Sequence, residues 1–277
     1  MMILAVVVTY YPEKETLENN INSIIHFVDK VLIWENTPDF EKQNYRLHTH
    51  EKIEYYGDGI NSISHGLNFA YRYAKENGYD YLLTMDQDSV FHNFDYYVKQ
   101  TICNQEAPVG LWTPCINDKE TIGDFEIIEM PITSGMLASI SMIDKIGGWN
   151  EYFTVDSVDD EFYLYANSVS INTYIVKGVK MKQQFGCPHK VIFMNHTITL
   201  RNYSSSRLYN IYRNSIILIR SYPSFSYIKK NFINCWIKQI IWILLFESDR
   251  PRKMYAIAKG ILFGLFCNLK MSLRSIE

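Results

Sequence analysis

The run Ile3–Thr9 constrains this chain more than any other feature of the sequence. Its residues, ILAVVVT, are apolar or β-branched throughout, with no alternation of polar and apolar side chains. A strand of this kind is covered on both faces, which is typical of a parallel sheet in an α/β protein. The run also lacks the basic residues and the small-residue cleavage site of a signal peptide, so we expect a buried strand of a cytoplasmic protein.

The sequence after this run alternates between strand and helix patterns. A helix with apolar residues at helical spacing is expected to start at Ser62, a good N-cap, and to stop at Asn77-Gly78. This β-α-β order predicts a parallel sheet, in which ligands bind at the carboxyl ends of the strands. The further expected strands cover 31–34, 53–56 and 81–85, and the expected helices cover 13–28 and 63–76.

Three short polar clusters directly follow predicted strands. They are Thr9-Tyr10-Tyr11-Pro12, Glu35-Asn36-Thr37 and Asp86-Gln87-Asp88. Two carboxylates at positions i and i+2 beyond a strand can hold a hard cation such as Mg²⁺ or Mn²⁺, which takes its other ligands from water and phosphate oxygens. An isolated D-x-D also occurs in surface turns, but its position after a buried strand favours a metal and phosphate site.

A second acidic cluster consists of Asp156, Asp159, Asp160 and Glu161. Two interpretations of it remain open. Acidic residues in the first turn of a helix that begins near Asp159 would stabilise the helix dipole. Alternatively, one carboxylate would act as a general base toward a hydroxyl group.

Charge is distributed unevenly along the chain. Residues 1–200 carry 14 basic and 27 acidic side chains, whereas residues 201–277 carry 13 basic and 3 acidic ones. A nucleic-acid binder that uses the whole chain is therefore disfavoured, and a basic C-terminal module that contacts an anionic surface is favoured. The five cysteines are widely spaced and include no C-x-x-C, which disfavours a disulfide framework and a zinc knuckle.

The strongest apolar stretch lies in the basic C-terminal part, at 232–246. It has about 15 residues, fewer than the roughly 20 that span a bilayer. Lys230, Asn234 and Lys238 form one polar stripe on a helix that is otherwise apolar. Such a helix either packs into a core or lies in a membrane interface, and the sequence leaves both possibilities open.

Taken together, these motifs resemble the inverting family 2 glycosyltransferases with a GT-A fold, and among them the bacterial rhamnosyltransferases. The resemblance spans residues 8 to 214 and rests on blocks that follow one another in the same order. The blocks are Val8-Thr9-Tyr10-x-Pro12, Glu35-Asn36-Thr37, Asn68, Leu83-x-Met85-Asp86-Gln87-Asp88-Ser89, Thr133-Ser134-Gly135, Val158-Asp159-x-Glu161-Phe162-x-Leu164, His196 and Tyr209-x-x-Tyr212-Arg213-Asn214. The chain departs from the family at Glu35, where the family has Asp, and at Tyr165, where it commonly has Arg.

The resemblance implies a fold and a set of roles. The fold is a Rossmann-like, mostly parallel sheet flanked by helices over residues 1–200. The charge and the apolar stretch of residues 201–277 separately predict a basic helical region that associates with a membrane or oligomerises. Asp159 is the implied catalytic base. The implied nucleotide and donor contacts are Thr9, Tyr11, Asn36, Asn68, Asp86, Gln87, Tyr209 and Arg213. The implied acceptor contacts are Trp149, Asp156 and Glu161, and the implied ligands of a divalent metal, Mg²⁺ or Mn²⁺, are Asp88, Asp86 and His196.

The implied activity is metal-dependent, inverting sugar transfer in the synthesis of a cell-surface polysaccharide, on the cytoplasmic face of the cell membrane. L-rhamnose from dTDP-rhamnose is the preferred donor, and a UDP-hexose such as UDP-galactose or UDP-glucose is the alternative. The acceptor would be a saccharide or a polyprenyl-diphosphate-linked glycan. Two other classes remain: a nucleotidyltransferase, disfavoured because 9–15 has no glycine for a phosphate loop, and a non-catalytic sugar-binding module, disfavoured because Asp88 and Asp159 are both present.

Overall fold

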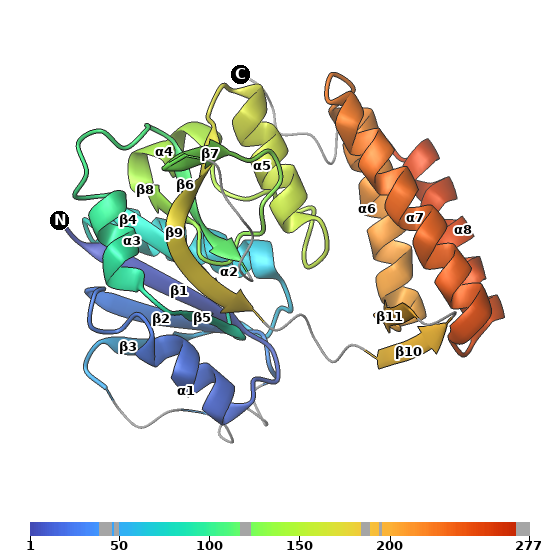
Figure 1. The fold of residues 1–277 in the computed structure, drawn as a ribbon, viewed down its shortest axis with the longest axis horizontal. Coiled ribbons are helices and arrows are strands. Elements are labelled where there is room, and N and C mark those ends of the chain that lie inside the picture. The colour runs from blue at the N-terminus through green and yellow to red at the C-terminus, as the bar shows by residue number, and fades with distance from the viewer. Residues whose placement is uncertain (39–45, 47–49, 117–122, 184–188, 194–195, 270–277) are drawn as a thin grey trace. The chain divides into compact units, whose positions relative to one another are not determined.

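In the computed structural model, the first part of the chain builds one mixed sheet (Figure 1). The structure describes residues 1–38, 46, 50–116, 123–183, 189–193 and 196–269. Nine strands from these residues pair in the order β3-β2-β1-β4-β8-β6-β9-β5, with β7 also paired to β9. The strands are β1 Ile3–Thr9, β2 Lys30–Glu35, β3 Ile53–Tyr56, β4 Tyr81–Asp86, β5 Ser89–Phe91, β6 Leu111–Ile116, β7 Phe125–Ile127, β8 Leu137–Ser139 and β9 Thr173–Gln183.

The parallel half of the sheet confirms the sequence prediction. β1 runs parallel to β2 and β4, and β2 runs parallel to β3. Every residue of β1 is buried, because helices cover both faces. Ile3, Ala5 and Val7 share a core with α1 (Lys14–Asn22) and α3 (Phe94–Gln100), while α2 (Ile63–Glu76) contacts β1 and β4. The apolar run is uninterrupted because its side chains are buried on both faces of the sheet.

The helix predicted over 13–28 is shorter than expected. α1 ends at Asn22, and the following residues form turns. The hydroxyl of Ser23 donates to the carbonyl of Asn20 at 2.6 Å, a local bond that competes with the helical pattern. Ile24, Ile25 and Val28 are still buried. Because these three residues are buried in a turn, their spacing resembles that of a helix. The sequence therefore predicted a longer helix than the structure has.

The other helix of this half matches its prediction. The Ser62 hydroxyl accepts a hydrogen bond from the backbone N–H of His65 at 3.2 Å and caps α2. α2 ends before Gly78, whose φ of +72° favours glycine. Two further helices follow in this part of the chain: α4 Ile140–Ile146 and α5 Val158–Ser168.

The second half of the sheet contains antiparallel pairs that the sequence did not predict. β8 runs antiparallel to both β4 and β6, and β9 runs antiparallel to β5 and β7 but parallel to β6. The pairing of Ser89 with Gln183 brings the end of β9 next to the loop that follows β4. This return of the chain adds side chains to the carboxyl edge of the parallel strands.

The chain divides into two compact units, Met1–Gln184 and Phe185–Glu277. The sequence placed the boundary after residue 200, but the hairpin of β10 (His189–Phe193) and β11 (His196–Leu200) groups with the later helices. The helices of the second unit are α6 Ser205–Ser221, α7 Ser226–Phe246 and α8 Arg250–Phe266.

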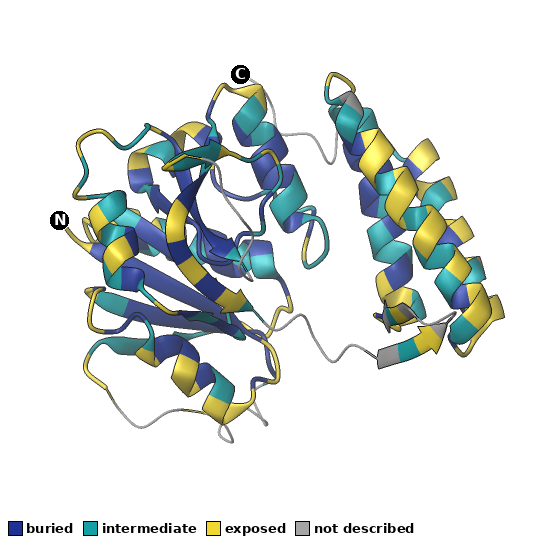
Figure 2. Cartoon of the chain, viewed as in Figure 1, coloured by how far each residue is buried: buried dark blue, intermediate teal, exposed yellow. Residues whose placement is uncertain are grey.

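Helix α8 packs closely on α6 through two glycines. A Cβ at Gly260 would lie 2.5 Å from the carbonyl oxygen of Tyr209, and one at Gly264 would lie 2.8 Å from that of Arg213. A small buried cluster of Leu208, Tyr212, Ile243 and Ile257 joins the three helices. Figure 2 shows that many residues of α7 and α8 stay exposed, whereas the strands of the first unit are mostly buried.

Candidate active site

The three polar clusters converge at one edge of the sheet, as predicted. In the parallel register Thr9 lies beside Glu35 and Val8 lies beside Asp86, so the ends of β1, β2 and β4 are level. The Gln87 side chain accepts a hydrogen bond from the Tyr10 N–H at 2.7 Å and donates to the Tyr10 carbonyl at 3.2 Å. The loops after β1 and β4 are therefore tied together by the amide that the sequence assigned to donor binding.

Two tyrosines stand at this edge. Tyr10 and Tyr11 are about half exposed, at 48% and 50%, and their rings meet edge to face with centroids 4.6 Å apart. Tyr11 has a φ of +46°, a left-handed backbone conformation that is costly for an aromatic residue. Its N–H donates to the Thr37 hydroxyl at 2.8 Å, which holds this conformation. Strained residues cluster at functional sites, in line with the predicted place of Tyr11 beside a nucleotide base.

Two groups of carboxylates face one another across this edge. Asp86 accepts a hydrogen bond from the Gln183 amide at 2.6 Å, and Asp88 follows it in the loop. Asp159 and Asp160 lie in the first turn of α5, and the Thr133 hydroxyl donates to Asp159. Because α5 begins at Val158, the carboxylates in its first turn stabilise the helix dipole, as one interpretation of the second acidic cluster predicts; the general-base role stays a prediction.

The charged forms of these carboxyl groups are disfavoured. Burial raises the pKa of Asp86 to about 7, and the negative charges of Asp159 and Asp88 add to this effect. Burial, together with the charge of Asp159, also raises the pKa of Asp160 to about 7. The pKa values of Asp159 and Asp88 are raised by burial as well. A group of carboxyls with raised pKa values is typical of functional sites, where a cation or a proton relieves the repulsion.

The block Thr133-Ser134-Gly135 connects the two groups. The backbone N–H of Asp86 donates to the Ser134 hydroxyl at 2.9 Å, while the neighbouring Thr133 hydroxyl contacts Asp159. Gly135 has a φ of +82°, and a Cβ there would lie 2.6 Å from Pro114. Only glycine fits this tight passage of the chain. The block thus sets the distance between Asp86 and Asp159.

Sequence reasoning missed two of the supporting side chains. Gln183, which holds Asp86, lies at the end of a strand whose pairing partner was not predicted. Asn20 donates to the carbonyls of Asp86 and Ser89 at 2.7 and 2.5 Å. Its signal was present in the sequence, because a polar residue occupies a buried position next to Ile21 on the apolar face of α1.

Thr9 and Asn36 are buried and bonded within the protein. The Thr9 hydroxyl donates to the Trp34 carbonyl at 3.2 Å, and the Asn36 side-chain oxygen accepts from the Trp34 indole at 3.0 Å and from the Ser62 N–H at 3.4 Å. Their exposures are 0% and 3%. Both side chains are thus held inside the protein where β1 and β2 end, and their predicted contact with a nucleotide stays a prediction.

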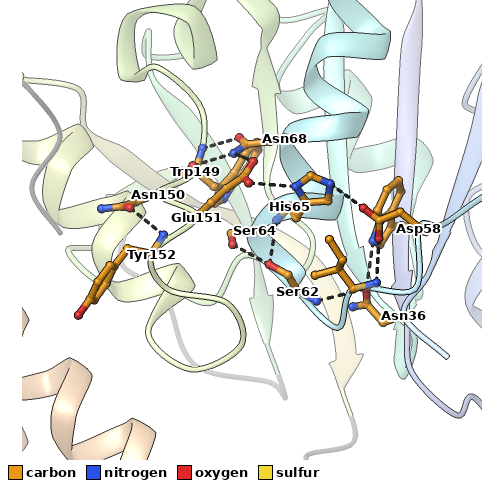
Figure 3. A network of polar contacts seen from close by, with 12 residues as sticks. Asn36, Asp58, Ser62, Ser64, His65, Asn68, Trp149, Asn150, Glu151 and Tyr152 are labelled. Atoms are coloured by element: carbon orange, nitrogen blue, oxygen red, sulfur yellow. Dashed lines mark hydrogen bonds and ion pairs between the residues drawn. The ribbon is translucent and has the colours of Figure 1, made fainter. Parts of the chain in front are cut away.

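A polar network on α2 binds the loop that leads to α5 (Figure 3). Asn68 donates to the Trp149 carbonyl and to Glu151, both at 2.8 Å, and accepts from the Trp149 N–H at 2.7 Å. His65 lies between Asp58 and Glu151, with a ring nitrogen 2.9 Å from each carboxylate. Both donor hydrogens and the oxygen of the Asn68 amide thus have protein partners, and its predicted contact with the donor stays a prediction.

Two residues predicted to contact the acceptor also pack within the protein, and their acceptor role stays a prediction. Trp149 is 3% exposed and stacks on Phe162 with ring centroids 4.6 Å apart, so its ring is a packing element and not an open platform. Glu161 is 2% exposed and accepts from the Asn150 amide at 3.2 Å. Asp156 is half-buried in the loop before α5, and its assignment stays a prediction.

Glu35 differs from the Asp of the resembled family, and the structure gives it a specific partner. Arg46 contacts both oxygens of the buried Glu35 carboxylate, at 2.7 and 3.4 Å. The longer Glu side chain is thus bound by a guanidinium group.

The remaining predicted residues belong to the second unit. His196 begins β11, and its side chain lies outside the described residues. In α6, the Arg213 guanidinium lies 5.7 Å from the centre of the Tyr209 ring, so these two residues form a cation–π pair. Their predicted roles at the diphosphate stay predictions.

No family model matches the sequence. The sequence is 25% identical over 245 residues to the dTDP-rhamnosyl transferase RfbF of Shigella flexneri, an alignment that covers 79% of this chain and 80% of RfbF.

Solved structures share the fold. The structure of GalNAc-T7 with UDP, GalNAc and Mn²⁺ matches 79% of this chain with a TM-score of 0.59 at 9% identity, and the chain spans about half (48%) of that protein. The structure of S. aureus TarS 1–349 with UDP-GlcNAc matches 95% of this chain and 81% of that one, with a TM-score of 0.58 at 13% identity. The chain has a GT-A-type fold, and its sequence is similar to that of a rhamnosyltransferase.

Proposed function

We propose that this protein is an inverting glycosyltransferase that moves L-rhamnose from dTDP-rhamnose to a saccharide or lipid-linked acceptor. One observation carries the proposal. Asp86 and Asp159 lie close enough at the carboxyl edge of the sheet for the negative charge of Asp159 to add to the effect of burial in raising the pKa of Asp86, in a chain similar to a dTDP-rhamnosyl transferase. A donor diphosphate on the Asp86 side and a hydroxyl on the Asp159 side would meet between them.

Asp159 is the proposed base. The acceptor hydroxyl gives its proton to the Asp159 carboxylate as its oxygen forms a bond to the anomeric carbon. The bond from that carbon to the diphosphate oxygen breaks on the opposite face, so the configuration inverts. Burial raises the pKa of Asp159 toward the operating pH, which strengthens it as a base. The Thr133 hydroxyl, which contacts Asp159, would orient the carboxylate.

A divalent cation is the proposed cofactor. Among the described residues, no group of three or more His, Cys, Asp and Glu side chains could hold a metal ion alone. Asp86 and Asp88 nevertheless fit Mg²⁺ or Mn²⁺, because these ions bind through one or two carboxylates and take further ligands from phosphate and water. Burial raises the pKa of both groups, and a bound cation would favour their charged forms. When bound, such an ion stabilises the charge of the leaving diphosphate.

A donor screen tests the proposal. Purified protein is incubated with dTDP-rhamnose, UDP-galactose, UDP-glucose or UDP-GlcNAc, with Mg²⁺, Mn²⁺ or EDTA, and release of nucleoside diphosphate is measured. We expect the fastest release from dTDP-rhamnose, and only with metal. NMR of the product should give an anomeric configuration opposite to that of the donor.

Each alternative predicts a different result. Faster turnover of a UDP-sugar would support the UDP-hexose alternative, which draws on the UDP and UDP-GlcNAc in the two solved structures. Undiminished turnover in EDTA would overturn metal dependence. Binding of every donor without release of any nucleotide, with a range of saccharide acceptors present, would favour a sugar-binding module.

A further inference from the structure

Helix α7 has an apolar stripe that stays exposed among the described residues of the second unit. Its exposed apolar residues recur every three or four positions, with exposures between 37% and 53%, and so share one face. On the opposite face Trp236, Ile240 and Ile243 pack against α6 and α8. The helix is therefore apolar on both sides, which explains why its sequence is apolar apart from one polar stripe. The exposed stripe consists of Ile233, Ile237, Ile241, Leu244 and Leu245.

Helix α8, which contacts α7, ends in a second group of exposed apolar residues. Leu262, Phe263, Leu265 and Phe266 follow one another in its last turns, and the exposure of Phe266 reaches 82%. Figure 2 draws the outer residues of α7 and α8 as exposed. Isolated exposed apolar residues are ordinary, but a group of this size on adjacent helices marks an interaction surface.

The other half of α8 is basic and borders a cavity. Arg252, Tyr255 and Lys259 lie on one face of α8, and the next turns of the same face carry Phe263 and Phe266. The three residues line a cavity of about 300 Å³ together with Ser205, Ser206, Tyr209 and Asn210 of α6. The cavity therefore also borders Tyr209, for which the resemblance implies donor binding. Hydroxyl and cationic groups around a cavity suit a phosphate oxygen. One helix face therefore joins a phosphate-compatible cavity to an exposed apolar strip.

The charges around this surface are mostly basic, and its one exposed acidic residue among those described, Asp249, pairs with Arg252 at 3.2 Å. α7 contains three lysines and no acidic residue, and α8 contains four basic residues and no acidic residue. Glu247, between the two helices, is buried in an ion pair with Lys253 at 2.8 Å. Lys253 thus contributes to the core of the unit and not to its surface. Lys229, Lys230 and Lys238 of α7 are exposed.

We propose that α7 and α8 form a surface that binds an anionic phospholipid bilayer, with one headgroup phosphate in the cavity beside Arg252 and Lys259. Charge complementarity selects this occupant, because a second copy of the same face would bring positive charge against positive charge. The binding is peripheral: no helix among the described residues is both long and apolar enough to cross a bilayer. The exposed apolar side chains would enter the headgroup region while the lysines contact phosphates.

Sedimentation with vesicles tests this proposal on the full chain, without a nucleotide sugar, so the result does not depend on the transferase activity. We expect retention by vesicles of equal parts phosphatidylcholine and phosphatidylglycerol, little retention by phosphatidylcholine alone, and partial release at high salt. Failure of the anionic vesicles to retain the wild-type protein would overturn the proposal.

Variants separate the contributions of charge, apolar contact and cavity. Changing Lys229, Lys230 and Lys238 to Gln should weaken partitioning by about an order of magnitude or more. The matched control changes three exposed lysines of the first unit and should leave partitioning unchanged. The control residues are Lys99, Lys145 and Lys177.

The apolar and cavity variants complete the test. Changing Ile233, Ile237 and Ile241 to Ser should weaken partitioning even at low salt, and Arg252→Gln with Lys259→Gln should reduce the preference for anionic lipid. Circular dichroism and gel filtration check each fold and its oligomeric state. If wild type is a dimer that the Ser variant converts to monomer, with vesicle retention unchanged, the face is an interface between copies and the proposal is wrong.

Discussion

The network around Asn68 and the carboxylates around Asp86 lie in the same unit, but their polar atoms are satisfied in different ways. Asn68 bonds with every donor hydrogen and its acceptor oxygen inside the protein, and His65 has a carboxylate partner at each ring nitrogen. By contrast, Asp86, Asp159 and Asp160 are half-buried, and the charge of Asp159 acts on both of the others, so that their carboxyl groups have raised pKa values. A network whose polar atoms are all hydrogen-bonded holds a loop in place. Carboxyl groups that repel one another are instead suited to bind a cation or a proton.

We therefore expect the carboxylates around Asp86 to act in catalysis and the network around Asn68 to hold the loop that leads to α5. The loop after α4 carries Trp149 and Glu151 and leads into α5, whose first turn holds Asp159. By fixing that loop on α2, Asn68 fixes the start of α5. Changes in the carboxylate region should therefore abolish turnover with little effect on folding, and changes in the network should reduce stability first.

The largest expected effect is that of Asp88→Ala. Loss of this carboxylate would leave the diphosphate charge uncompensated, and because metal stabilisation supplies several kcal/mol, turnover should fall by about three orders of magnitude. Nucleoside diphosphate release at saturating Mg²⁺ measures the effect, with Asp124→Ala, an exposed aspartate of the same unit, as the control. Turnover of Asp88→Ala close to that of wild type would remove Asp88 from the site.

Asn68→Ala should act on stability. The change leaves the N–H and carbonyl of Trp149 buried without partners, at about 1–3 kcal/mol for each unsatisfied group. Thermal unfolding should shift down by several degrees, while Asn19→Ala, an exposed position on α1, should leave the midpoint unchanged. An unchanged midpoint together with a large loss of donor affinity would instead support the predicted contact of Asn68 with the donor.

The smallest expected effect is on the pH dependence of stability. The pKa of Asp160 is raised to about 7 in the folded protein, above its ordinary value of 3.8. The folded state thus binds a proton that the unfolded state has released, so the free energy of unfolding should fall as pH rises from about 4 to about 7. Asp160→Asn should reduce this fall, as measured by thermal unfolding in EDTA across the window. An equal pH dependence in wild type and variant would show that Asp160 is not buried beside like charges.

The sequence predicted the parallel half of the fold because its signals there are local. The apolar run at 3–9 and the cap at Ser62 each depend on adjacent residues, and both are confirmed. The end of α1 was missed because Ile24, Ile25 and Val28 remain buried in a turn. The antiparallel pairs of β8 and β9 were missed because pairing between distant segments leaves no local pattern in a single chain.

The same limit applies to the candidate site. Polar residues after strands predicted the convergence of Thr9, Glu35 and Asp86. The partners of a polar side chain depend on tertiary packing, so Asn68 was assigned to a ligand although its amide bonds to a backbone, and Gln183 received no role. The resemblance to a family located the region of the candidate site. The hydrogen bonds then showed which of its side chains have partners within the protein.

The most direct test of the account is the change Asp159→Asn, which preserves shape and removes the proton acceptor. Turnover with the donor selected by the screen should fall by about 10²–10⁴-fold, as for other general bases. Calorimetric titration of the same donor, with Mg²⁺ present, should give an affinity within about threefold of wild type, because Asp159 faces the acceptor. If donor affinity falls as far as turnover does, Asp159 contacts the donor or supports the fold, and the proposed division of the site between Asp86 and Asp159 is wrong.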